Sequence, residues 1–256
     1  MPDTGSVVLS TLEFDVLWER EQLPARHVAL NVPSPGRTHT ERAELVKGAF
    51  ETLEQRGLAK NSRAVPELAD WFALLAYPQC SVDSWVWTDH QISSLAVVGG
   101  GTGLLAVVEP TEVWLIPARD TAIAEAAVSV AGTMPAGRGY SVSVATDLLV
   151  AADARSHGSV PELASALKDS GVATSDANTL ATMLSGMGTR GQFGAERRQR
   201  DQQVRRADRV VAFHDTLDGR YGYLARPNPS GQSWSTVTPA DNAMLAGWVR
   251  ELLDEV

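Results

Sequence analysis

The 256-residue chain has very few of the residues and runs that mark several common protein classes. Its single cysteine, Cys80, cannot form an internal disulfide, which favours a reducing, cytoplasmic setting. No stretch of 18 or more apolar residues occurs, so we expect no membrane span. The first ten residues, MPDTGSVVLS, lack a basic segment followed by an apolar one, and we therefore expect no secretory signal.

Positive charge is also scarce over most of the chain. The formal net charge is −9, which argues against a general nucleic-acid binder and favours solubility. Residues 190–209 break this trend, because they hold seven arginines against three acidic residues. The hydrophobic fraction of 44% is enough for a sizeable core in one large domain or two small ones.

Recognisable catalytic and metal-binding motifs are missing as well. His39 and Glu41 have the H-x-E spacing of zinc deaminases, but the paired cysteines of those enzymes are absent, and capping of a helix explains both residues. The five histidines are scattered without the spacing of metal ligands on a helix. Nothing in the sequence therefore calls for a metal, a cofactor or catalysis, although a catalytic site can also assemble in space from residues far apart in the chain.

The first half contains signals for one short strand, several helices and a meander. Apolar residues at helical spacing predict helices over 11–21 and 38–57, the first with Thr11 and the second with Thr38 at its start. Within the first segment, FDVLW is also compatible with an extended strand. Residues 27–33 are interpreted as a short strand that stops at Pro33. Further on, the chain is expected to form a helix over 65–78, strands over 81–89, 91–100, 103–110 and 112–118, and a helix over 120–132.

The second half repeats this order of strand, helices, meander and helix. We expect a strand over 140–145, helices over 147–154, 160–171 and 175–187, strands over 191–198, 205–215, 219–227 and 233–241, and a closing helix over 242–255. The pattern predicts an α+β fold with a quasi-twofold internal duplication. Its two subdomains, 1–134 and 135–256, would form a single compact unit sharing one sheet.

A glycine-rich stretch, Gly99–Gly103, resembles the loops that cradle phosphate groups in nucleotide-binding proteins. Such a loop needs a helix directly after it, so that free N–H groups and the helix dipole face the anion. Here the apolar run LLAVVEP follows instead and ends at Pro110. A hairpin turn with glycines at positive φ therefore explains the stretch better, and a nucleotide-binding protein is an alternative function.

Two other features in the second half each allow more than one interpretation. The arginine-rich hairpin of residues 190–209 is a solvated loop, a protein contact or a nucleic-acid contact, although no aromatic residues are interleaved with its arginines. A regulatory nucleic-acid binder is thus a second alternative function. Leu180, Met183, Leu184 and Met187 follow helical spacing, which fits core packing or an adaptable binding surface.

Four stretches, in this order, give the chain a family resemblance. They are LSTLEFDVLWERE, VPSPGRTHTERA, GQFGAERRQRDQQVRRADRVVAFHDTLDGRYGYL and TVTPADNAMLAGWVRELL. Together they resemble the EspG proteins of mycobacterial type VII (ESX) secretion, and the resemblance runs over residues 10–255. It implies a central antiparallel sheet flanked by two helical bundles, in agreement with the repeated order of elements.

The resemblance also implies a function and a binding surface. EspG proteins are cytosolic, non-enzymatic chaperones that bind PE–PPE heterodimers at the apolar tip of the PPE bundle, keep them soluble and target them to secretion. In the family, recognition uses the sheet and the C-terminal helical bundle. We expect an apolar patch with a charged rim here, formed by Leu180, Met183, Met187, Arg205, Arg206, Arg209, Phe213, Asp215 and Tyr221. Whether the free chain self-associates, and which secretion system it serves, stays open.

Overall fold

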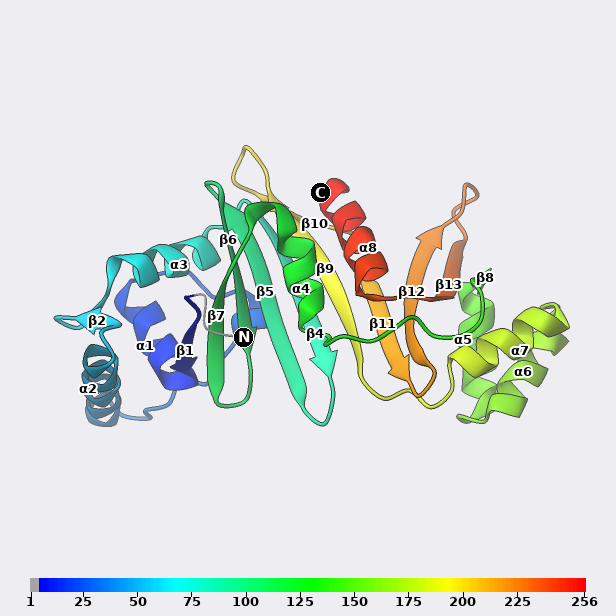
Figure 1. The fold of residues 1–256 in the computed structure, drawn as a ribbon, viewed down its shortest axis with the longest axis horizontal. Coiled ribbons are helices and arrows are strands. Elements are labelled where there is room, and N and C mark those ends of the chain that lie inside the picture. The colour runs from blue at the N-terminus through cyan, green and yellow to red at the C-terminus, as the bar shows by residue number, and fades with distance from the viewer. Residues whose placement is uncertain (1–4) are drawn as a thin grey trace.

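The computed structural model describes residues 5–256, whose main feature is one eleven-stranded antiparallel sheet with helices on both faces (Figure 1). Its strands are β1 (Val7–Ser10), β4 (Cys80–Trp87), β5 (Gln91–Gly99), β6 (Thr102–Val108), β7 (Glu112–Ala118), β8 (Val142–Ala145), β9 (Arg190–Arg198), β10 (Val204–Arg206), β11 (Val211–Thr216), β12 (Gly219–Pro227) and β13 (Ser233–Pro239). Two short strands, β2 (Ala59–Lys60) and β3 (Arg63–Ala64), form a separate hairpin.

The strand order is the same in the two halves when each is followed from its outer edge to the centre. The sheet runs β1-β7-β6-β5-β4-β9-β11-β12-β13-β8, with β10 added beside β9. Each half thus begins with an edge strand and places a four-stranded meander inside it, and β4 meets β9 at the centre. The predicted antiparallel sheet is confirmed, whereas the internal duplication and the division at residue 134 stay predictions.

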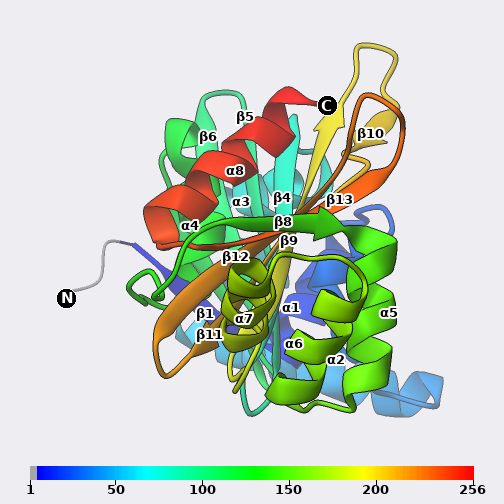
Figure 2. The ribbon, with the colours of Figure 1, turned by 90° about the vertical axis from the view of Figure 1, so that its right-hand side faces the viewer.

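Helices cover the sheet in two layers. Both helical bundles lie on one face, at opposite ends, and α4 and α8 lie on the other face (Figures 1 and 2). The N-terminal bundle comprises α1 (Thr11–Arg20), α2 (His39–Gln55) and α3 (Pro66–Ala76), and the C-terminal bundle comprises α5 (Thr146–Ser156), α6 (Val160–Asp169) and α7 (Thr174–Met183). The remaining helices are α4 (Ile123–Ser129), α8 (Asn242–Asp254) and the short 3-10 segments η1 (Val28–Leu30) and η2 (Asp120–Ala122).

Three apolar cores follow from this arrangement. Alternate residues of the N-terminal strands, such as Leu95 and Leu104, pack under α1 and α3. The residues between them on the strands, such as Ala96 and Leu105, pack under α4 and α8 together with Phe193. This division is the consequence of the two-residue period of a strand. The third core fills the C-terminal bundle.

Local signals placed most helix ends correctly. Thr38 caps α2 by accepting a hydrogen bond from the Glu41 N–H, as predicted. Helix α1 is capped by Ser10 rather than by Thr11, because Ser10 and Glu13 form a reciprocal capping box. Among the described residues, no helix is long and apolar enough to cross a membrane.

The glycine-rich stretch is a hairpin turn, as predicted. Strand β5 ends at Gly99 and β6 begins at Thr102, with Gly100 and Gly101 between them at φ 59° and 79°. Positive φ at both central residues is the requirement of the tightest hairpin turns, and glycine meets it without strain. Because a strand follows the glycines, the arrangement of a phosphate-binding loop is not formed.

Two predicted strands differ in the structure. Residues 27–33 are not a strand, because the His27 side chain accepts a hydrogen bond from the Ala29 N–H and starts η1. The strand predicted over 205–215 is divided into β10 and β11. Strand β10 pairs with the end of β9 and β11 with its beginning, and both lie on the edge of β9 opposite to β4.

Candidate functional site

An open face lies at the centre of the sheet, between the two helical bundles. Trp85 on β4, Gln192 on β9 and Ala212 on β11 are directly opposite one another in the strand register, and all three are only half-buried. Their neighbours along the strands point to α4 and α8 instead. We call this surface the open face; its members are Asp83, Trp85, Gln192, Gly194 and Ala212.

An apolar groove borders the open face on the side of the C-terminal bundle. Its floor is formed by strand residues, and its wall by α5 and by the segment that follows α7. Two apolar side chains of the wall are well exposed, since Val150 is 63% and Met187 is 45% accessible. The groove is lined by Trp87, Leu149, Val150, Asp153, Leu184, Met187, Arg190, Gly191, Gln192, Ala212, Phe213, His214 and Tyr223.

A charged cluster lies on the open face, on the side of the N-terminal bundle. Arg206 of β10 donates two hydrogen bonds to Asp83, at 2.7 and 3.1 Å, and one to Glu196 at 2.7 Å. His27, the residue that precedes η1, approaches Glu196 at 3.6 Å. His27 and Arg206 hold the pKa of Glu196 below its usual value, against the opposing effect of burial. The cluster, His27, Asp83, Glu196 and Arg206, therefore joins four segments of the chain.

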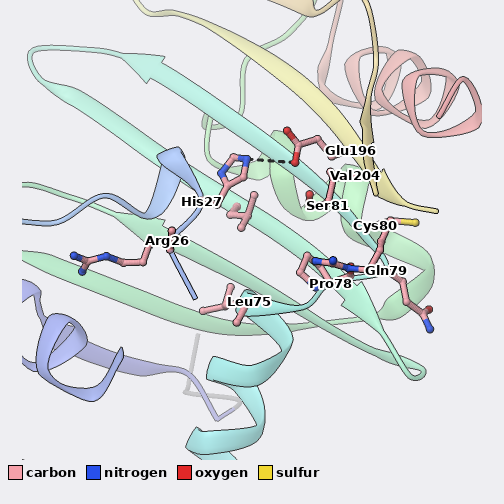
Figure 3. A pocket seen from close by; sticks show the side chains of 13 residues that line it. Arg26, His27, Leu75, Pro78, Gln79, Cys80, Ser81, Glu196 and Val204 are labelled. Atoms are coloured by element: carbon pink, nitrogen blue, oxygen red, sulfur yellow. Dashed lines mark hydrogen bonds and ion pairs between the residues drawn. The ribbon is translucent and has the colours of Figure 1, made fainter. Parts of the chain in front are cut away.

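Beside this cluster lies a small hollow lined by both polar and apolar residues (Figure 3). In it His27 and Glu196 point toward each other, whereas the Arg26 guanidinium extends away from both. Ligand atoms of His27, Asp83 and Glu196 all lie within 4.8 Å of one another, which is close enough to hold a metal ion. Arg206 already binds both carboxylates, so the group forms an ion-pair network in this structure.

The predicted charged rim is only partly on the open face. Arg206 lies there, with its side chain 44% exposed. Arg205 points to the opposite side of β10, because successive side chains of a strand alternate. Arg209 is mostly buried and pairs with Glu255 at the end of α8. Met187 is the predicted apolar residue that is exposed at the groove.

Four of the predicted apolar residues are interior side chains. Leu180, Met183 and Tyr221 belong to the core of the C-terminal bundle, and the Tyr221 hydroxyl donates to the carbonyl oxygen of Arg138. Phe213 packs under α4 and α8, where its ring stacks on that of Phe193. The apolar surface of these four side chains is buried within the chain, so they support the open face and the groove from below and scarcely contact solvent.

Asp215, predicted at the charged rim, is buried in a different network. Arg220 is fully buried and donates to both carboxylate oxygens of Asp215, at 2.7 and 2.9 Å. Its other N–H groups reach the carbonyl oxygens of Ala131 and Gly132 and the amide oxygen of Asn242. The guanidinium thereby ties the end of α4 and the start of α8 to β11 and β12.

Other arginines of the hairpin are also used within the chain. Arg197 donates to the carbonyl oxygens of Leu253 and Val256, and Arg198 donates to that of Pro78. Their cationic groups therefore secure the C-terminal end and the α3–β4 connection. The local excess of positive charge in residues 190–209 is in large part structural.

The most exposed apolar residue of the groove, Val150, was not among the predicted site residues. Neither were Trp87, Leu149, Ala212 and Tyr223. The sequence offered a partial signal, because Trp85 and Trp87 alternate with Val82, Ser84 and Val86 along β4 and so define a second face. Nothing local in the sequence indicates that residues of α5 and β11 line the same groove.

The fold and its hollowed surface define a class of protein: a large antiparallel sheet with two helical bundles on one face and an apolar groove where the sheet meets the second bundle. A comparison with protein-family models matches the EspG family over residues 10–251. The chain therefore belongs to the EspG family.

Solved structures show the same fold. The structure of the Mycobacterium tuberculosis type VII secretion system chaperone EspG5, in complex with a PE25–PPE41 dimer, superposes with a TM-score of 0.77. The alignment covers 98% of this chain and 96% of EspG5, at 15% sequence identity. No curated protein matches the chain by sequence. The structural likeness confirms the predicted architecture of a central sheet with two helical bundles.

Proposed function

We propose that this chain is a cytosolic, non-enzymatic chaperone of type VII secretion that binds a PE–PPE heterodimer through its open face. The observation that carries the proposal is the apolar groove between the sheet and the C-terminal bundle, found in a chain of the EspG family. EspG5, which shares the fold, was solved in complex with a PE25–PPE41 dimer.

The groove has the chemistry needed to cover an apolar tip. Val150 and Met187 project from its two wall segments, so both would lose water on binding. Burial of apolar surface contributes about 25 cal/mol per Å² to binding. An exposed apolar tip on the partner would otherwise promote its aggregation. We therefore place the apolar tip of the PPE bundle in the groove, with the flexible Met187 adapting to its shape.

Co-expression tests the proposed function. The chain should elute with a PE–PPE heterodimer from the same genome as a stable 1:1:1 complex in size-exclusion chromatography. If none of the PE–PPE pairs of that genome forms such a complex with the folded chain, the proposal is wrong.

A further inference from the structure

Arg206 holds a fixed position on the open face with part of its hydrogen-bonding capacity unused. An arginine has five N–H donors. Those of Nη1 point to Asp83 and Glu196, and one of Nη2 points to Asp83. Among residues 5–256, no acceptor is bonded to Nε or to the second N–H of Nη2. The Arg206 side chain as a whole is 44% exposed.

The unused edge has the geometry of a carboxylate receptor. The Nε–H and the outer Nη2–H of a guanidinium are parallel, and such a pair of donors matches the two oxygens of a carboxylate. Asp83 and Glu196 accept from the N–H groups on the other edges of the planar guanidinium. A further carboxylate at the Nε–Nη2 edge would therefore not displace them. Because Asp83 is buried, it holds the guanidinium in place before any partner binds.

Gly194 makes room for the guanidinium above β9. A Cβ atom at this position would collide with Nη2 of Arg206 and come within 2.8 Å of Asp83 Oδ1. The absence of a side chain thus lets Arg206 cross from β10 over β9 onto the open face. Gly194 is two residues from Gln192, a floor residue of the apolar groove, which is about 7 Å along a strand.

From this juxtaposition, and resting on the proposed function, we propose that Arg206 is the polar anchor of the partner-binding surface and receives an aspartate or glutamate of the partner bundle. The spacing along β9 is close to one helical turn, about 5.4 Å. A partner helix therefore presents an apolar residue to the groove and a carboxylate to Arg206 from positions three or four residues apart. The groove and Arg206 together then select partners by charge as well as by shape.

Arg206→Lys tests the anchor, with Arg205→Lys as the matched control. Lysine keeps a positive charge beside Asp83 and Glu196 but has no parallel pair of donors. Affinity for the PE–PPE heterodimer that co-elutes with the wild-type chain should fall about tenfold or more in Arg206→Lys. Arg205→Lys, whose side chain points away from the open face, should stay within about twofold. An Arg206→Lys protein that melts like the wild type and binds equally well would overturn the proposal.

A scan of the partner keeps the test decisive if Arg206→Lys does not fold. Each aspartate and glutamate at the tip of the PPE bundle is replaced by its amide and measured against the wild-type chain. One of these amide variants should weaken binding about tenfold. If Arg206→Lys folds, combining it with that amide variant should weaken binding no further than either change alone. If no amide variant weakens binding, the anchor is refuted. If the wild-type chain binds no heterodimer, the proposed function fails instead.

Discussion

Replacing Arg220 by methionine is expected to lower the free energy of unfolding by about 3–5 kcal/mol. The substitution leaves the Asp215 carboxylate buried without its partner, and it removes the donors to the carbonyl oxygens of Ala131 and Gly132. It also removes the guanidinium that lies 4.6 Å from the centre of the Phe213 ring. Urea unfolding followed by tryptophan fluorescence measures the change.

Two controls separate the loss of the pair from the loss of the side chain. Arg226→Met removes an arginine of the same strand whose pair with Glu251 is half exposed, and it should cost at most about 1 kcal/mol. The double variant Asp215→Leu with Arg220→Met should be more stable than Arg220→Met alone, because no unpaired charge remains. Equal destabilisation by Arg220→Met and Arg226→Met would contradict this account of the network.

Met187→Asp is expected to weaken binding of the PE–PPE heterodimer by about 100-fold or more. The substitution puts a charge where the groove would exclude water, and truncating one central apolar anchor already costs about 2 kcal/mol. The free chain should keep its stability, because Met187 is already 45% exposed, in a segment between α7 and β9. Binding is measured by titration calorimetry and stability by thermal unfolding.

Met244 offers a matched control for this variant. It lies on α8, on the other side of the sheet, and its exposed fraction is 45%, equal to that of Met187. Met244→Asp should therefore leave the affinity within about twofold. Val150→Asp repeats the test from the α5 wall of the groove and should resemble Met187→Asp. If all three variants bind alike, the groove is not the binding surface.

The elements of this fold could be predicted because their signals are local. Pro66 at the first turn of α3, the cap at Thr38 and the Gly100–Gly101 turn each act within a few residues. The 3-10 turn at Val28–Leu30 was missed because the Ala29 N–H donates a hydrogen bond to the His27 side chain, and this bond competes with the apolar pattern of a strand. Boundaries of this kind depend on single contacts.

The Asp215–Arg220 pair shows where such reasoning stops. Once the turn is placed at residues 217–218, the hairpin register puts Asp215 directly opposite Arg220, so the pair itself could have been predicted. Its burial could not, because it depends on the end of α4 and the start of α8, far away in the sequence. A polar residue on a strand was therefore interpreted as a surface residue.

The groove was out of reach for the same reason. Its walls come from α5 and the segment after α7, and its floor comes from β4, β9, β11 and β12. The helical spacing correctly indicated that Leu180 and Met183 share an apolar stripe, but the helix predicted over 175–187 ends at Met183, so Met187 is not part of that stripe. Met183 is inside the bundle, while Met187 lies beyond the end of α7 and stays exposed.

Oxidative footprinting of the methionines tests the central claim, that the groove beside the open face is the partner-binding surface. Met187 and Met244 have equal exposure in the free chain and should be oxidised at similar rates, while the buried Met183 should react slowly. In the complex with the PE–PPE heterodimer, the account predicts that Met187 is protected and Met244 is unchanged. Protection of Met244 with continued oxidation of Met187 would contradict it.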